Sequence, residues 1–128
     1  MDCSAALYSF LSTNATVTAA VSTRSYPISL PQSATLPALV YSEIDPGFLH
    51  AMIADAAERM PIFEIEAHAN TELGAANAMA AVVSALTDYS GAMGSQTGTT
   101  LSIMFSDDGY DPESETFYKS HEFKIFMK

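Results

Sequence analysis

The sequence predicts one α+β domain over residues 1–128: a four-stranded, mostly antiparallel sheet with a main helix and an N-terminal helix packed on one face. Three observations favour this fold. Apolar residues recur at helical spacing near the N-terminus and again after residue 70, the segment PIFEIEAHA alternates between apolar and polar residues, and the elements follow the order helix, two strands, helix, two strands. The chain of 128 residues has the size of one domain, and 48 % of its residues are hydrophobic, enough for a core.

The first predicted helix covers residues 2–12, because Asp2 or Ser4 can cap its N-terminus and apolar residues follow on one stripe. That stripe consists of Leu7, Phe10 and Leu11. A short second helix is expected over Ala15–Val21, after the capping residue Asn14. Its inward side would consist of Val17, Ala20 and Val21.

The main helix is predicted over residues 71–89. Asn70 or Thr71 caps it, and Glu72 lies in its first turn, where the helix dipole favours an acidic side chain. The expected apolar face consists of Leu73, Ala76, Met79, Ala80, Val83 and Leu86.

The first two strands are predicted on either side of residues 48–60. One covers residues 38–44 and ends at a turn signal, Asp-Pro-Gly, and the other covers residues 61–69. The second strand has an apolar face and a polar face, as a half-buried strand does. The apolar face consists of Phe63, Ile65, Ala67 and Ala69.

The last two strands are predicted over residues 99–106 and Thr116–Met127, joined by an acidic hairpin loop. In the earlier strand the expected apolar face consists of Leu101, Ile103 and Phe105. In the final strand it consists of Phe123, Ile125 and Met127.

Three segments are predicted to lie outside helices and long strands. Residues 25–36 contain two of three closely spaced prolines and should form an extended, irregular segment in front of a strand. Residues 48–60 are interpreted as a short helix, a long mobile loop, or an arm that pairs with another subunit. Residues 90–100 are rich in Gly, Ser and Thr and are predicted to be flexible.

The net charge of −10 excludes the usual way of holding nucleic acid, in which basic side chains neutralise phosphates. An acidic wall would instead repel a DNA backbone and let it slide past, although acidity can also serve only solubility. No apolar run approaches a membrane span, and the N-terminus lacks the basic region of a signal peptide, so the chain is expected to be made in a cytoplasm. The single cysteine, Cys3, excludes an internal disulfide and a cysteine-rich zinc site.

Glu64, Glu66 and His68 project from one face of one predicted strand and are the candidate ligands for a divalent metal or for acid–base work. Alternate residues of a strand lie about 7 Å apart, so metal ligation would need a partner from another strand. The favoured interpretation is a polar surface, paired with Lys124 across the sheet.

The loop of residues 107–115 contains five acids, Asp107, Asp108, Asp111, Glu113 and Glu115. Calcium is the obvious ligand to consider, but the spacing does not match the helix–loop–helix calcium motif and strands flank the loop. An exposed acidic loop is therefore expected.

The sequence contains no motif that indicates an enzyme. His50 and His121 are isolated from any nucleophile motif, and there is no glycine-rich phosphate loop. We therefore expect no catalytic residues, no metal and no cofactor.

The order of short motifs resembles that of the tail completion, or tail terminator, proteins of long-tailed bacteriophages, the tail-to-head joining family. The residues that carry the resemblance are Arg24-Ser25-Tyr26-Pro27, Leu36-Pro37 with the strand after it, and Asp111-Pro112-Glu113 with Phe117-Tyr118. The resemblance covers nearly the whole chain, and residues 48–60 depart most from the family pattern.

The resemblance implies a structural virion protein, not an enzyme. Such proteins form a ring, usually a hexamer, at the head-proximal end of the tail tube, where they end tail polymerisation and join the tail to the capsid neck. The implied partners are other copies of the chain, the tail tube protein and a head–tail connector or neck protein. DNA passes through the channel without specific binding, no membrane is involved, and the location is the tail–neck junction of the virion.

Two surfaces follow as hypotheses from the residues and this resemblance together. The expected subunit interface consists of Pro27, Leu30, Pro31, Leu49, Met52, Ile53 and Arg59. The expected acidic surface, facing the channel or a docking partner, consists of Glu64, Glu66, Asp107, Asp108, Asp111, Glu113 and Glu115.

Three alternatives remain open on the sequence. The first is a neighbouring head–tail connector protein of similar fold. The second is a small ligand-binding or regulatory α+β module that dimerises through its sheet. The third is a metal-dependent hydrolase that uses Glu64, Glu66 and His68.

Overall fold

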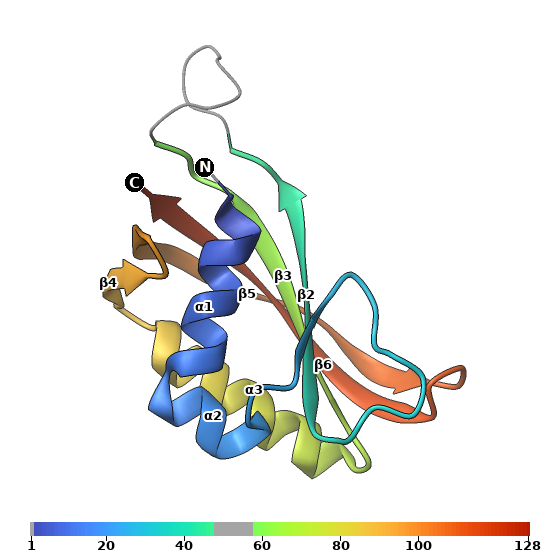
Figure 1. Cartoon of the computed structure of the whole chain (residues 1–128). Coiled ribbons are helices and arrows are strands. Elements are labelled where there is room, and N and C mark those ends of the chain that lie inside the picture. The colour runs from blue at the N-terminus through green and yellow to red at the C-terminus, as the bar shows by residue number, and fades with distance from the viewer. Residues whose placement is uncertain (1, 48–57) are drawn as a thin grey trace.

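A computed structural model describes residues 2–47 and 58–128 of the chain. Six strands form one sheet in the order β1-β2-β3-β6-β5-β4, and helices are packed against it (Figure 1). The elements in chain order are α1 (Cys3–Thr13), α2 (Ala15–Val21), β1 (Ser25–Pro27), β2 (Ala38–Asp45), β3 (Ile62–Ala69), α3 (Glu72–Leu86), β4 (Ser90–Met93), β5 (Gln96–Asp111) and β6 (Thr116–Met127).

The predicted four-stranded, mostly antiparallel sheet is wrong, because the sheet has six strands and is mixed. The proline-rich segment begins with β1, which pairs in parallel with β2; Ile28 N–H donates to the Tyr41 carbonyl at 2.9 Å. The Gly/Ser-rich segment contains β4, which forms a hairpin with β5. Each added strand has only three or four residues, too few for an alternating pattern.

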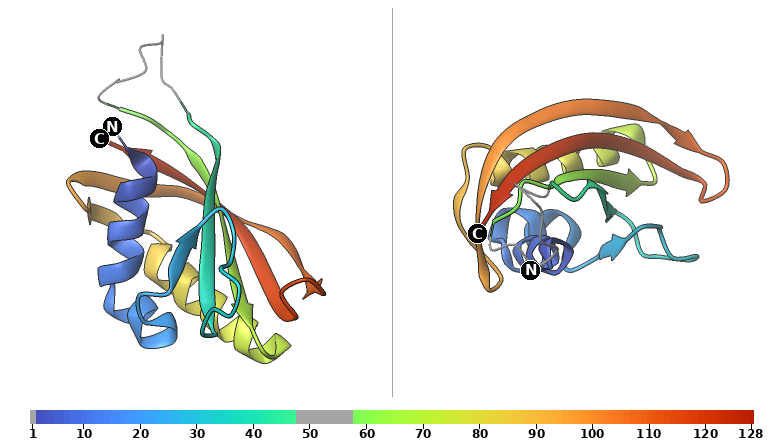
Figure 2. Two further views of the ribbon diagram at one scale, coloured as in Figure 1. Left: turned by 45° about the vertical axis from the view of Figure 1, so that its right-hand side comes forward. Right: turned by 90° about the horizontal axis from the view of Figure 1, so that it is seen from above.

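The sheet is strongly curled, and β5 and β6 arc over the helices when the molecule is seen from above (Figure 2, right). The core lies between the sheet and the three helices, where α2 contacts α3, and α3 contacts β3 and β6. Its largest fully buried side chains include Phe63, Phe123, Leu7, Leu11 and Leu39. Burial of this apolar surface is the main source of stability for the fold.

The predicted helix starts and caps are confirmed. The Asp2 carboxylate accepts the Ala5 N–H at 3.0 Å, and the Asn14 side chain accepts the N–H groups of the first turn of α2. The Thr71 hydroxyl accepts the Gly74 N–H at 3.0 Å at the start of α3. These side chains satisfy backbone donors that have no partner within the helix.

The predicted apolar face of α3 is displaced around the helix. Leu73 is 69 % exposed and Ala80 is exposed, whereas the buried residues are Ala75, Ala78, Met79, Val82 and Leu86. Because alanine occupies so many positions, several stripes of this helix are apolar and periodicity alone cannot select one. The stripe that lies inward combines Ala75 and Ala78 with Met79, Val82 and Leu86.

The long strands differ from the prediction mainly in β5, which extends through Asp111 and so includes part of the predicted acidic loop. Its pairing with β6 shifts register between Thr100 and Ser102, and Leu101 is 50 % exposed. Phe105 is 61 % exposed. In β3 and β6 the predicted apolar faces are buried, but His68, expected on the polar face, is also buried.

The chain leaves the sheet at Gly47 and returns at Met60, and the two backbones touch there. The Met60 N–H donates to the Gly47 carbonyl at 2.8 Å. Gly47 has a φ of 61°, and a Cβ at this position would collide with the Met60 carbonyl, so only glycine fits. In the part of the chain that the structure describes, no helix is long and apolar enough to cross a membrane.

Candidate functional site

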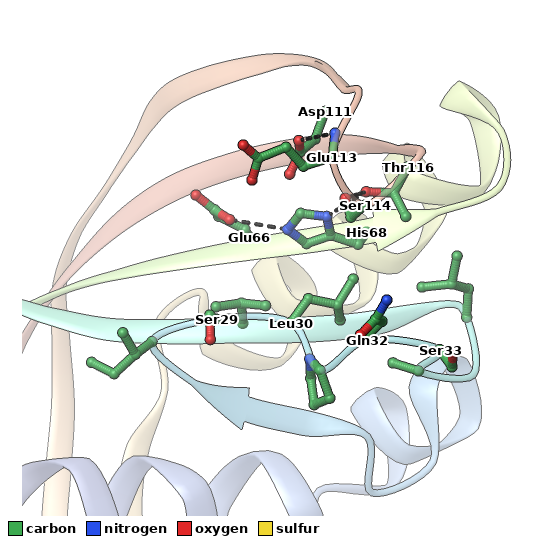
Figure 3. A pocket seen from close by; sticks show the side chains of 15 residues that line it. Ser29, Leu30, Gln32, Ser33, Glu66, His68, Asp111, Glu113, Ser114 and Thr116 are labelled. Carbon is green, nitrogen blue, oxygen red and sulfur yellow. Dashed lines mark hydrogen bonds and ion pairs between the residues drawn. The ribbon is translucent and has the colours of Figure 1, made fainter.

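A cavity of about 480 Å³ opens beside the β5–β6 turn (Figure 3). This turn projects beyond the helices at one end of the molecule (Figure 1). One wall is the strap, which we define as residues 28–37, between β1 and β2. The other wall is formed by the ends of β3, β5 and β6. The polar side chains on this wall are Glu66, His68, Asp111, Glu113, Ser114 and Thr116.

His68 lies at the centre of the polar wall and is almost fully buried. Its Nδ1 lies 2.8 Å from the Thr116 hydroxyl, and its Nε2 lies 3.0 Å from a Glu66 carboxylate oxygen (Figure 3). The Thr116 hydroxyl also contacts the Ser114 hydroxyl at 2.7 Å. This chain of hydrogen bonds fixes the start of β6 against the end of β3.

Asp111 adds negative charge to the rim of the cavity. Its carboxylate accepts the Glu113 N–H at 2.9 Å, and this bond, with the Ser114 hydroxyl, lowers the pKa of Asp111 below its ordinary value. The group is therefore fully ionised at neutral pH.

The suggested metal ligands Glu64, Glu66 and His68 do not converge on one point. Both ring nitrogens of His68 already have partners, and the Ser106 hydroxyl donates to Glu64 at 3.2 Å. Among the described residues no group of three or more potential ligands could hold a metal ion. The geometry therefore gives no support to the hydrolase alternative.

Lys124 does not lie opposite the acids of β3, as the sequence had suggested. It pairs in register with Ile62, and the residue opposite Glu64 is Glu122. Two carboxylates on neighbouring strands thus face each other, an arrangement that destabilises the sheet.

Six carboxylates gather on one side of the sheet, which we call the acidic face. Glu64 and Glu66 alternate with the buried Phe63 and Ile65 along β3, so they point away from the helices. Asp107 accepts the Tyr118 hydroxyl at 3.1 Å, and the Tyr118 ring lies 5.8 Å from that of His68. The members of the acidic face are Glu64, Glu66, Asp107, Asp111, Glu113 and Glu122.

Two of the acids predicted for this surface lie elsewhere. Asp108 forms an ion pair with Lys119 at 3.0 Å. Glu115 lies in the exposed turn before β6, with a φ of 57°. Sequence reasoning missed Glu122, which the alternation of β6 places on the polar side.

The predicted subunit interface separates into three parts. Pro27 and Pro31 are exposed and Leu30 is half-buried, all on or next to the strap. Arg59 is buried within its own chain, where it pairs with Glu43 at 3.0 Å and donates to the Pro46 carbonyl at 2.9 Å. The other three predicted residues, Leu49, Met52 and Ile53, lie outside the described residues, as does His50.

A second concave surface, the groove, lies between the C-terminal end of α3 and β5 and was not anticipated from the sequence. Its volume is about 440 Å³, and it is lined by Val83, Thr87, Asp88, residues 100–103, Phe105 and His121. The alternating apolar residues of β5 indicated a covered face, but α3 ends at Leu86 and leaves Leu101 and Phe105 uncovered.

Two polar atoms of the groove residues, Thr100 Oγ1 and His121 Nδ1, are buried without a hydrogen-bond partner. Burial lowers the pKa of His121 below its ordinary value, so the ring is neutral at neutral pH. The Thr100 N–H donates to the Tyr89 carbonyl at 3.0 Å, and beyond Thr100 β5 pairs only with β6 among the described residues, so its other edge is open from Leu101 onward.

Comparison with known proteins identifies a family and a similar fold. The family model described as "Tail completion protein gp17" matches residues 5–128. No curated protein matches the chain. A chain of the solved structure described as "Virion of native gene transfer agent (GTA) particle" matches with a TM-score of 0.54 at 17 % identity, over 94 % of this chain and 89 % of that chain. At this identity the match to the solved structure establishes a shared fold.

Proposed function

The chain belongs to the tail completion protein gp17 family and is a structural protein of the phage tail, and from this premise we propose that it forms a closed ring at the head-proximal end of the tail tube. The ring ends tube polymerisation and presents the surface to which the neck of the capsid joins. Its partners are other copies of the chain, the tail tube protein and a head–tail connector protein. The proposed location is the tail–neck junction of the virion.

The acidic face is the observation that favours a channel. Its six carboxylates lie on the side of the sheet opposite to the helices, and His68, the buried imidazole between them, holds the hairpin in position. Lys124 lies on the same side, two residues beyond Glu122 and farther from the cavity. A surface of one sign repels DNA phosphates, so a ring with this face inward lets DNA pass without sticking.

Electron microscopy of particles assembled with and without the gene tests the proposed position. The expected result without it is filled capsids beside tails that are both unattached and overlong. Unattached tails of normal length would assign the chain to the neck instead, and normal joined virions would remove the structural role.

The channel is tested separately with a variant that removes two charges from the acidic face, Asp107→Asn with Glu113→Gln. A matched control removes two charges at the starts of helices, Asp2→Asn with Glu72→Gln. We expect slower DNA ejection from particles with the first variant only, at unchanged tail length. Equal ejection rates in both would show that the acidic face does not line the DNA path.

A further inference from the structure

We infer that the strap of one subunit docks in the groove of the next, an inference that rests on the proposed ring. The strap follows β1 at one edge of the sheet, and β5, which lines the groove, lies next to the strand at the other edge (Figures 1 and 2). A contact between two different surfaces of the same chain is head-to-tail, and repetition of such a contact closes a ring when the rotation fits.

The strap presents a strained apolar side chain to solvent. Ile28 is 76 % exposed, and its φ of 71° is one that a β-branched residue rarely adopts. Its N–H is fixed on the Tyr41 carbonyl. Because the Ile28 side chain is exposed, no packing within the subunit compensates for its backbone strain. A contact with another molecule would bury the side chain and so account for both the strain and the exposure.

The groove has the complementary properties. Phe105 is 61 % and Leu101 is 50 % exposed along it, which is a large apolar surface for two residues of one strand. An exposed apolar surface of this kind is typical of an interaction site, so the groove has the character of half an interface.

Charge favours a second copy of this chain as the occupant. The strap has no ionisable residue, and the described groove residues include only Asp88 and the neutral His121. Copies of a chain with net charge −10 repel each other, and contacts through the acidic face would bring carboxylates together. Strap and groove are two surfaces through which such copies can meet with little repulsion.

Disulfide cross-linking tests the contact. The test variant is Ile28→Cys with Phe105→Cys, and the control is Ile28→Cys with Met104→Cys. Met104 is 59 % exposed, almost as much as Phe105, but it pairs with Glu122 and so faces the opposite side of β5. Cys3 is 1 % exposed and remains in both variants and in the wild-type control. Samples are oxidised at a concentration where light scattering shows wild-type oligomers, and denaturing gels are then run without reductant.

The expected result is a ladder of cross-linked multimers for the Phe105→Cys pair and at least tenfold less multimer for the Met104→Cys pair. If oligomers form but the Phe105→Cys pair gives no more cross-linked multimer than the Met104→Cys pair, the inferred contact is wrong, while the proposal of a ring still stands. A wild-type chain that stays monomeric both at high concentration and on tail tubes would remove the ring, and the inference would fall with it.

A second variant, Ile28→Gly, separates docking from folding. Glycine accepts a φ of 71° without strain, so the monomer should unfold at the same or a higher temperature. The dissociation constant of the oligomer should nevertheless rise at least tenfold. An unchanged dissociation constant would contradict a role for Ile28 in the contact.

Discussion

Replacing Arg59 by methionine tests whether this residue stabilises the subunit or serves an interface. Arg59 is only 6 % exposed, and its guanidinium reaches both Glu43, at 3.0 Å, and the Pro46 carbonyl, at 2.9 Å. The backbone N–H of Arg59 donates to the Met127 carbonyl at 3.0 Å, so the residue joins the last strand to the end of β2. Removing one member of a buried ion pair costs about 3–5 kcal/mol, because the other charge is left without a partner.

The lower end of that range applies here, since the Glu43 side chain is 24 % exposed and water can partly replace the lost partner. A loss of about 3 kcal/mol, with a urea m-value of about 2 kcal/mol/M, lowers the midpoint of urea unfolding by about 1.5 M. The double variant Arg59→Met with Glu43→Leu should recover most of that loss, because an apolar pair replaces both charges. A single variant whose midpoint stays within about 0.2 M of wild type would refute the reasoning.

Further predictions concern single groups. Leu7→Ala should lower the free energy of unfolding by about 2–5 kcal/mol in urea titrations, since Leu7 is fully buried; a loss below about 1 kcal/mol would contradict its place in the core. His121 has a pKa lowered by burial, so the unfolded chain takes up its proton first and stability should fall as the pH drops below about 6.5. Replacing His121 by glutamine should reduce the loss of stability below about pH 6.5. An unchanged dependence of stability on pH would show that His121 does not cause the loss. Burial raises the pKa of Cys3, so a thiol reagent at pH 7 should react only after unfolding; rapid reaction of the native chain would show that Cys3 is accessible.

The elements that the sequence predicted well are those whose signals are local. The caps Asp2, Asn14 and Thr71 bond to N–H groups two or three residues away, so their meaning is contained in a few residues. The alternation of β3 similarly identifies the buried Phe63 and Ile65 without reference to any neighbour.

The elements that were missed depend on distant parts of the chain. The strand β1 exists because Ser25–Pro27 lies alongside β2, and its three residues carry no periodic signal of their own. The stripe of α3 that faces the sheet is selected by packing against distant residues. The sequence of a helix rich in alanine does not indicate which of its apolar stripes this is.

The sequence identifies acidic and apolar residues but not how the fold arranges them. The acidic character of the β5–β6 hairpin is visible in the sequence, yet the register that sets Glu122 opposite Glu64 comes from strand pairing. The groove could not be predicted because it results from where α3 stops, and Leu101 and Phe105 are apolar whether or not a helix covers them.

The contact between Gly47 and Met60 has a consequence for engineering. The two backbones are joined by a hydrogen bond where the chain leaves and re-enters the sheet, so the ends of a peptide inserted between them are held close together. For an inserted flexible peptide, the entropic cost of closure grows slowly, by about 0.6 kcal/mol for each doubling of length. A peptide tag inserted between these two residues should therefore leave the subunit folded, which gives a position for a label that can be located in assembled particles.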